Sequence, residues 1–280
     1  MSQLEELAHA LLAKLEAEQP SVGVRGIGVG TAGQVNWKEG SIAHSSDLIP
    51  GYTGTPIARV LRSRYGMPVF VDNDVNALAL TEKYLGAGRE ASHLLCLALG
   101  TGVGGALLLD GSILHGSWGG AGEIGHLSVD WQGRECVCGG YGCLEQYASG
   151  TAIARRMNEL LGRQGSPDQE MTTRETVARW LQGDPLASQA MNEAIHALGV
   201  AIASLIHVLN PQAVVIGGGV SEIGEPLFRP LREAVRRRAM PSLARDVAIL
   251  PAYGGNLGAV IGAGLQAWEY AQDESRRKAE

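Results

Sequence analysis

Three cysteines and one histidine in the middle of the chain have the spacing of metal ligands. His126 lies ten residues before Cys136, and Cys138 and Cys143 follow within seven more. Zinc binds thiolate sulfur and imidazole nitrogen, and a structural zinc ion is enclosed by four such ligands. The sequence therefore predicts one structural Zn²⁺ bound by these four side chains. With all four positions filled, the metal has no open position for activating water, which argues against a metal-dependent hydrolase.

Two glutamates bracket this cluster. Glu123 lies three residues before His126, and Glu145 lies two residues after Cys143. Carboxylates accept hydrogen bonds, so two of them held in place can bind the hydroxyls of a polyhydroxylated ligand. We expect Glu123 and Glu145 to do this, although solvated loop acids would have the same spacing. Four other histidines show no partner spacing and are assigned no role: His93, His115, His196 and His207.

Asp74 is the candidate for proton transfer. It lies in the run Val-Asp-Asn-Asp-Val-Asn-Ala of residues 71–77, between an expected strand and an expected helix. A carboxylate at the end of a strand can take a proton from a substrate hydroxyl. Aspartate is also a preferred helix cap, and a cap would explain one of the two aspartates in this run. Both interpretations of Asp74 stay open at this point.

Two glycine-rich turns follow expected strands. They are Gly-Thr-Gly-Val-Gly-Gly at 100–105 and Gly217–Gly219. Backbone N–H groups without side chains can surround a phosphate, and a flat glycine turn can support a nucleobase and ribose. Neither turn matches the Walker pattern or a G-x-G-x-x-G helix start, so each alone could be a tight turn. Two such turns after two strands favour a nucleotide ligand.

Composition limits the class of protein. The 280 residues are 45% hydrophobic and 19% charged, with a net charge of −6 and no basic run, so we expect no nucleic-acid partner. The longest apolar stretch, 197–209, is shorter than the roughly 20 residues that a membrane-spanning helix needs, so a buried core helix is expected. Cysteines at metal spacing, without a visible secretory signal, indicate a reducing cytoplasm.

Helices and strands alternate along the chain. Helices are expected at 3–18, 55–65, 75–85, from about 146, at 185–209 and at 259–276, and strands at 22–30, 67–71, 94–99, 105–109, 213–216 and 247–250. This order is typical of an α/β protein with its ligand at the carboxyl ends of strands. Because the strand pattern restarts near residue 93, we expect an N-terminal α/β lobe over 1–93 and a C-terminal α/β lobe over 94–280. The closing helix, from about residue 266, is expected to pack on the first lobe.

Four segments resemble the ROK family (repressors, open reading frames, kinases) in order and spacing. They are Val-Asp-Asn-Asp-Val-Asn-Ala, Leu-Gly-Thr-Gly-Val-Gly-Gly, Gly-Glu-Ile-Gly-His and Cys-Val-Cys-Gly-Gly-Tyr-Gly-Cys-Leu-Glu-Gln-Tyr-Ala-Ser-Gly. The resemblance runs from about Val24 to Gly262. It implies an actin-like ATPase (ribonuclease H-like) fold of two α/β lobes, phosphorylation of a sugar by ATP with Mg²⁺, and commonly a homodimer. The run Ser-Asp-Leu-Ile-Pro-Gly-Tyr-Thr-Gly-Thr at 46–55 resembles kinases for glucose, β-glucosides or N-acetylmannosamine.

The resemblance also implies residue roles. Asp74 resembles the general base that acts on the accepting hydroxyl of a hexose or N-acetylhexosamine. The expected substrate contacts are Gly33, Asn73, Glu123, His126 and Glu145. The expected nucleotide contacts are Thr101, Gly102, Gly104, Gly217, Gly218 and Gly219. The implied activity is that of a glucokinase-like transferase of carbohydrate metabolism.

One motif of the family is missing. The family begins with a strand hairpin carrying Asp-x-Gly-Gly-Thr, which grips the ATP phosphates and helps to hold Mg²⁺, whereas this chain opens with the helix that follows it. In a truncated lobe, the strand expected over 24–29 would lose its neighbouring strands. The ATP triphosphate would lose one of the loops that bind it. A wrongly chosen start, a shortened gene and a trimmed chain each explain this. Two functions stay open: a sugar kinase, and a non-catalytic sugar-binding protein on a kinase scaffold. The repressor branch, which needs an N-terminal helix-turn-helix, is not expected.

Overall fold

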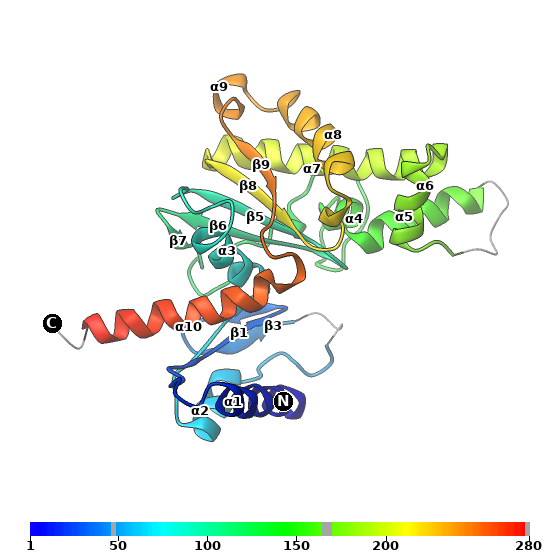
Figure 1. Cartoon of the computed structure of the whole chain (residues 1–280). Coiled ribbons are helices and arrows are strands. Elements are labelled where there is room, and N and C mark those ends of the chain that lie inside the picture. Colours follow the sequence, from blue (N-terminus) through cyan, green and yellow to red (C-terminus); the bar gives the residue numbers. More distant parts are fainter. Residues whose placement is uncertain (46–48, 164–169, 278–280) are drawn as a thin grey trace. The chain divides into compact units, whose positions relative to one another are not determined.

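The computed structural model describes residues 1–45, 49–163 and 170–277 (Figure 1). Two compact units make up the chain. Unit 1 consists of Met1–Leu80, His115–Gly120 and Ala259–Glu280, and unit 2 of Thr81–Leu114 and Ala121–Gly258. The lobe boundary expected at residue 93 therefore differs from the unit boundary at Leu80, and the final helix belongs to unit 1 from Ala259 onwards.

Unit 1 combines two small sheets with helices. Its elements are α1 (Ser2–Glu18), β1 (Ile27–Thr31), β2 (Gln34–Asn36), β3 (Ser41–His44), α2 (Ile57–Tyr65), β4 (Val69–Asn73), α3 (Asp74–Tyr84) through Leu80, and α10 (Gly258–Arg277) from Ala259. Strands β1 and β4 are parallel, and β2 and β3 are antiparallel. Apolar side chains from β1, β2, β3, α2 and β4 form its core, with Ile57, Leu61 and Val69 fully buried.

The register of β1 and β4 places the candidate base. Gly30 pairs with Asp72 and Thr31 pairs with Asn73, so β4 continues to Asn73, two residues beyond the predicted end at 71. The predicted first strand, 22–30, is also shifted, because regular pairing begins only at Ile27. Asp74 is therefore the first residue of a helix that follows directly from a strand.

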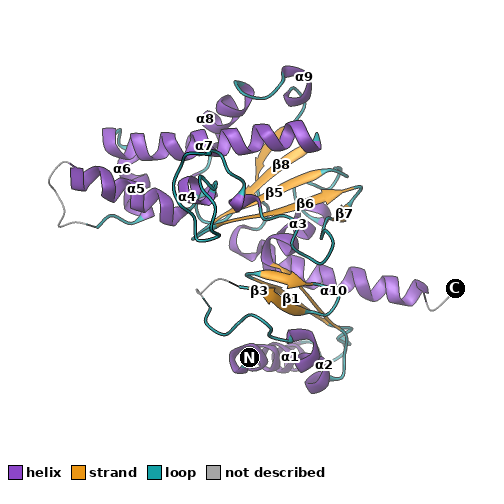
Figure 2. Cartoon of the chain, turned by 180° about the vertical axis from the view of Figure 1, so that it is seen from behind, coloured by secondary structure: helices purple, strands orange, loops and turns teal. Residues whose placement is uncertain are grey.

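Unit 2 is built on one five-stranded sheet in the order β7-β6-β5-β8-β9. The strands are β5 (Leu94–Leu99), β6 (Val103–Leu109), β7 (Ser112–Ile113), β8 (Ala213–Gly217) and β9 (Ala248–Pro251). β5, β8 and β9 are parallel, and β6 is antiparallel to β5. The helices are α4 (Glu145–Ala148), α5 (Gly150–Arg163), α6 (Thr173–Leu181), α7 (Pro185–Leu209), α8 (Glu225–Arg236) and α9 (Pro241–Ala244). Figure 2 shows α7 extending along the sheet, next to α8.

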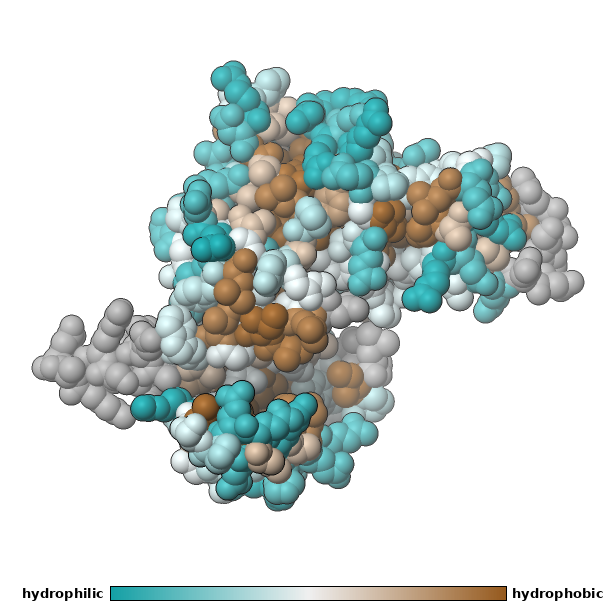
Figure 3. Space-filling view, in the orientation of Figure 1, coloured by the Kyte–Doolittle hydropathy of each residue, from teal (hydrophilic) through white to brown (hydrophobic). Residues whose placement is uncertain are grey.

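The long helix α7 is the centre of the unit 2 core. Its predicted bounds, 185–209, are confirmed, with Asp184 capping the N-terminus through the N–H groups of Leu186 and Ala187. Among the described residues it alone is long and apolar enough to cross a membrane, but 56% of its most apolar window is buried inside the protein. It packs with β5, β8 and α8 in the main core. The outer side of α8 carries hydrophilic side chains (teal in Figure 3), as expected for a helix that covers the core from one side.

Candidate functional site

The four predicted metal ligands come together in unit 2. A 3-10 turn, Ile124–His126, supplies the histidine, and the loop that leads to α4 supplies the cysteines. The four ligand atoms all lie within 4.8 Å of one another. The Sγ of Cys136 is 3.6 Å from Nδ1 of His126, and the Sγ atoms of Cys138 and Cys143 are 3.6 Å apart. With Zn–S of about 2.3 Å and Zn–N of about 2.0–2.1 Å, tetrahedral ligands lie roughly 3.5–3.8 Å apart, so the cluster fits one zinc ion.

The chemistry of the thiols agrees with a metal site. Burial, together with the neighbouring thiols, raises the pKa of Cys143 to about 12, whereas the backbone N–H of Gly140 lowers the pKa of Cys138. Three thiols this close cannot all ionise without a cation among them, because their negative charges repel. Thiolate and imidazole ligands are the set that zinc prefers. The donor set therefore fits the predicted zinc.

His126 and Glu123 lie next to each other. Because Nδ1 of His126 faces the cysteine cluster, its Nε2 is directed elsewhere, and it lies 3.9 Å from Oε2 of Glu123. The two side chains are 32% and 41% exposed, so both are accessible to a ligand. Metal binding at Nδ1 would fix the tautomer and orientation of the imidazole, leaving Nε2–H as a hydrogen-bond donor.

Glu145 has a contact that the sequence did not predict. Its Oε2 accepts a hydrogen bond of 2.9 Å from the backbone N–H of Val103, in the glycine-rich turn. A Cβ atom on Gly102 would lie 2.4 Å from the same oxygen, so the turn comes this close only with glycine there. Glu145 therefore links the metal loop to the turn at 100–104. Nothing in the spacing of residues 103 and 145 signals this contact.

The two glycine-rich turns lie side by side at the carboxyl ends of two neighbouring strands. β5 and β8 are neighbouring parallel strands with Ala98 opposite Gly217, so the turns that follow them are adjacent. The N–H of Val220 donates to Leu99 O at 3.0 Å, and the N–H of Gly150, the first residue of α5, donates to Gly100 O at 2.8 Å. Backbone N–H groups and a helix N-terminus at the carboxyl ends of parallel strands are suited to phosphate binding.

Gly218 provides a test of this arrangement. Its φ of +83° is unfavourable for other residues, and a Cβ there would lie 2.5 Å from Leu99 O. A Gly218→Ala variant is expected to displace the turn, weaken ATP-analogue binding at least tenfold and lower the melting temperature. Gly111→Ala, in the turn between β6 and β7, is the matched control, because its φ of +73° is similarly positive and a Cβ there meets nothing within 4 Å. Calorimetric titration of both variants checks this, and equal affinities would contradict the placement of nucleotide at this turn.

In unit 1, the side chain of Asn73 caps helix α3. The side-chain oxygen of Asn73 accepts from the N–H of Val75 at 2.8 Å, and its amide donates to Gly33 O at 3.1 Å. Two predicted substrate contacts, Gly33 and Asn73, therefore lie together. Because Asn73 occupies the capping position, the side chain of Asp74 is not needed as the cap.

Two buried residues beside this corner are not predicted by any pattern in the sequence. Asp72 and His115 form a hydrogen bond in which Oδ2 and Nε2 are 2.6 Å apart. The sequence predicts no role for His115, because 43 residues separate it from Asp72 and no spacing rule relates them.

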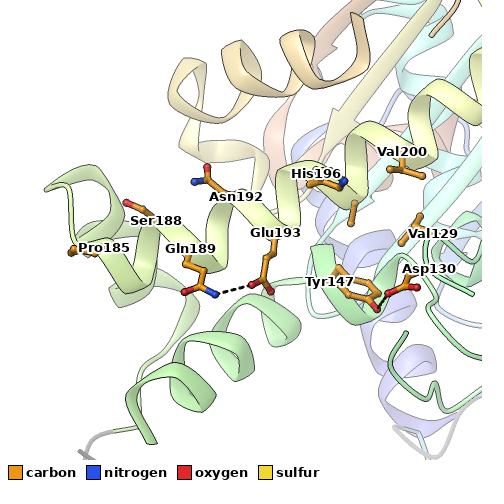
Figure 4. A pocket seen from close by; sticks show the side chains of 11 residues that line it. Val129, Asp130, Tyr147, Pro185, Ser188, Gln189, Asn192, Glu193, His196 and Val200 are labelled. Carbon is orange, nitrogen blue, oxygen red and sulfur yellow. Dashed lines mark hydrogen bonds between the residues drawn. The ribbon is translucent and has the colours of Figure 1, made fainter. Parts of the chain in front are cut away.

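A groove along α7 contains none of the candidate residues. Its volume is about 790 Å³, and Figure 4 shows it between α7 and the side chains of Tyr147 and Asp130. Glu193 in its wall is already paired with Arg156 through two hydrogen bonds of 2.7 and 2.6 Å. Of the run at 46–55, residues 46–48 lie outside the described residues.

Comparison with known proteins agrees with this geometry. The chain is 39% identical to a glucokinase of Thermotoga maritima over 225 residues, 77% of this chain and 70% of that protein. It is 34% identical to a putative xylose repressor of Caldicellulosiruptor over 84% of this chain and 61% of that protein. The structure of a ROK family glucokinase from Streptomyces griseus, in complex with glucose and AMPPNP, matches with a TM-score of 0.78 and 31% identity over 95% of this chain and 88% of that chain. The predicted α/β fold of the actin-like ATPase class is thereby confirmed. Residues 2–269 match the family model named ROK, and the chain belongs to the ROK family.

Proposed function

We propose that this protein is an ATP-dependent sugar kinase that phosphorylates a hydroxyl of a hexose or N-acetylhexosamine, with glucose as the first candidate. The observation that carries the proposal is the contact between Glu145 and Val103 in unit 2. It joins a loop bearing carboxylates and an imidazole, which suit sugar hydroxyls, to a glycine-rich turn, which suits phosphate. The glucokinases among its relatives support the same activity.

In the proposed mechanism, Asp74 is the general base. It orients the accepting hydroxyl and takes its proton as the new O–P bond forms and ADP leaves. The proposed sugar contacts are Gly33, Asn73, Glu123, His126 and Glu145. The proposed nucleotide contacts are Thr101, Gly102, Gly104, Gly217, Gly218 and Gly219. When bound, Mg²⁺ would neutralise charge on the phosphates. A zinc ion held by His126, Cys136, Cys138 and Cys143 would be structural and would keep the loop that carries Glu145 in place.

A coupled assay for ADP tests the activity. Glucose, mannose, N-acetylmannosamine, a β-glucoside and xylose are each supplied with ATP and Mg²⁺, and at least one is expected to give sugar-dependent ADP. The second candidate is a non-catalytic sugar-binding protein, which the similarity to a putative xylose repressor favours. The shift of the melting temperature with the same sugars distinguishes it from a kinase. Stabilisation by a sugar without ADP formation would replace the kinase with that function.

Glu145 gives a more specific prediction. Glu145→Ala removes the acceptor for Val103 N–H together with a proposed sugar contact, so the KM for sugar and the KM for ATP are both expected to rise at least fivefold. Glu145→Gln keeps a carbonyl oxygen for Val103, so its KM for ATP is expected to stay within about twofold. Glu123→Ala is the control, raising only the KM for sugar. If Glu145→Ala leaves the KM for ATP unchanged, the carboxylate does not hold the turn.

We also propose a cytoplasmic homodimer, which the resemblance to the family supports. Light scattering coupled to size-exclusion chromatography gives the mass in solution, and a mass of one chain would contradict the dimer.

A further inference from the structure

A buried network of polar side chains surrounds the carboxylate of Asp72 at the end of β4. The side chains of Asp72 and His115 are 4% and 9% exposed, and 2.6 Å separates Oδ2 from Nε2. Gln266 of α10 donates to the same oxygen at 3.3 Å. The other oxygen, Oδ1, accepts from the Asn76 amide at 2.8 Å and from the backbone N–H of Asn73 at 2.7 Å. Four donors therefore converge on one carboxylate inside unit 1.

The two bonds to Oδ1 come from either side of Asp74 in the chain. Asn73 is the last residue of β4, and Asn76 lies in the first turn of α3. The Asp72 carboxylate therefore links the last residue of strand β4 to the first turn of helix α3. Asp74 lies between these two residues, at the point where the strand passes into the helix. A buried carboxylate keeps one orientation only while its donors are present, since an unpaired buried charge is strongly unfavourable.

His115 itself is held in one orientation. Its ring stacks on Trp37 with the centroids 4.5 Å apart and the planes inclined by 20°. Trp37 stacks in turn on Tyr270 of α10 at 6.0 Å, and Tyr270 on Phe70 of β4 at 5.2 Å. The imidazole is therefore fixed by ring packing on a face and by the Asp72 carboxylate at Nε2. This arrangement leaves the carboxylate little freedom to turn.

We propose that His115 is a positioning residue for Asp74, acting through the carboxylate of Asp72. The proposal rests on the proposed kinase function, in which Asp74 is the general base. A base must meet the substrate hydroxyl at hydrogen-bond distance, so a small displacement lowers the rate of the chemical step more than it weakens binding. Loss of the hydrogen bond from His115 is therefore expected to lower kcat.

Three variants test the proposal. His115→Phe removes the donor and keeps an aromatic ring against Trp37, whereas His115→Gln keeps a donor. Leu61→Ala, in the fully buried core of unit 1, is the control for general destabilisation. Each is assayed well below its own melting temperature for kcat, KM for sugar and KM for ATP. We expect His115→Phe to lose tenfold or more in kcat with both KM values within threefold, His115→Gln to recover kcat to within threefold of wild type, and Leu61→Ala to keep kcat.

The outcomes separate this proposal from the kinase function. A folded His115→Phe variant with wild-type kcat, in a chain whose wild type is active, overturns the positioning role alone. An equal loss of kcat in Leu61→Ala overturns it too, because the effect would then be general destabilisation. A wild type without sugar-dependent ADP overturns the kinase function and the positioning role with it. If His115→Phe does not fold, Asp72→Asn replaces it, with the same expected loss and the same overturning result.

Discussion

Replacing Asp74 by asparagine is expected to lower kcat by roughly 10²- to 10⁴-fold, the usual contribution of a positioned general base. Asparagine has nearly the same shape and keeps the first residue of α3 in place, but it cannot take the proton of the sugar hydroxyl. Affinity for the sugar is expected to stay within about threefold, because the proposed contacts from Gly33, Asn73 and the unit 2 residues remain. The substitution is therefore expected to lower kcat and to leave the affinity for the sugar nearly unchanged.

Steady-state kinetics with the ADP-coupled assay and calorimetric titration of the sugar measure the two effects separately. Asp110→Asn is the matched control, because its side chain is 93% exposed in the turn between β6 and β7 and its positive φ of 51° suits asparagine. It is expected to keep wild-type kcat. Wild-type turnover by Asp74→Asn would exclude Asp74 as the base, and an equal loss in both variants would show that the effect is not specific.

The candidate site in unit 2 was largely predictable because its parts are local. The four candidate metal ligands lie between residues 126 and 143, and ligand spacing is a short-range property that a sequence displays directly. The glycine-rich turns could be predicted to meet because parallel strands bring their carboxyl ends to one edge. The contacts of Glu145 with Val103 and of Asp72 with His115 depend on tertiary packing between distant segments, so no pattern along the chain predicts them.

The missed elements have similar physical causes. β2 and β3 are only three and four residues long, too short for an alternating pattern to be visible. α8 contains Pro230 within its span, and proline inside an apolar pattern argues against a helix. α6 did carry a signal, the capping box of Thr172 and Glu175, which the structure shows with both hydrogen bonds formed. β5 has the predicted bounds, whereas β1 begins five residues later than predicted and β4 is shifted by two residues, because cross-strand pairing decides where a strand begins and stops.

Removing the metal is expected to lower both the stability of the protein and its affinities for sugar and ATP. The four candidate metal ligands close a loop that is also held by hydrogen bonds, such as the pairing of Ser128 with Cys143 and the two bonds from Arg134 to Glu159. Without a cation, the buried Cys143 thiol is protonated at neutral pH, and the His126 ring loses the bond that orients it. Glu145 follows Cys143 by two residues, so disorder in the loop reaches the turn at 100–104 through the bond to Val103.

Purified protein is therefore expected to contain one zinc per chain by elemental analysis, and a strong chelator is expected to lower its melting temperature by about 10 °C, which is a few kcal/mol for a protein of this size. Sugar and ATP-analogue affinities should both fall at least tenfold, and added zinc should restore them. Cys136→Ser is expected to reproduce the loss, whereas Cys96→Ala, a buried cysteine of β5, is expected to keep the metal. Loss of sugar affinity with unchanged ATP-analogue affinity would show that the loop binds sugar without supporting the phosphate turn. A metal-free protein with unchanged melting temperature would contradict a structural role for zinc altogether.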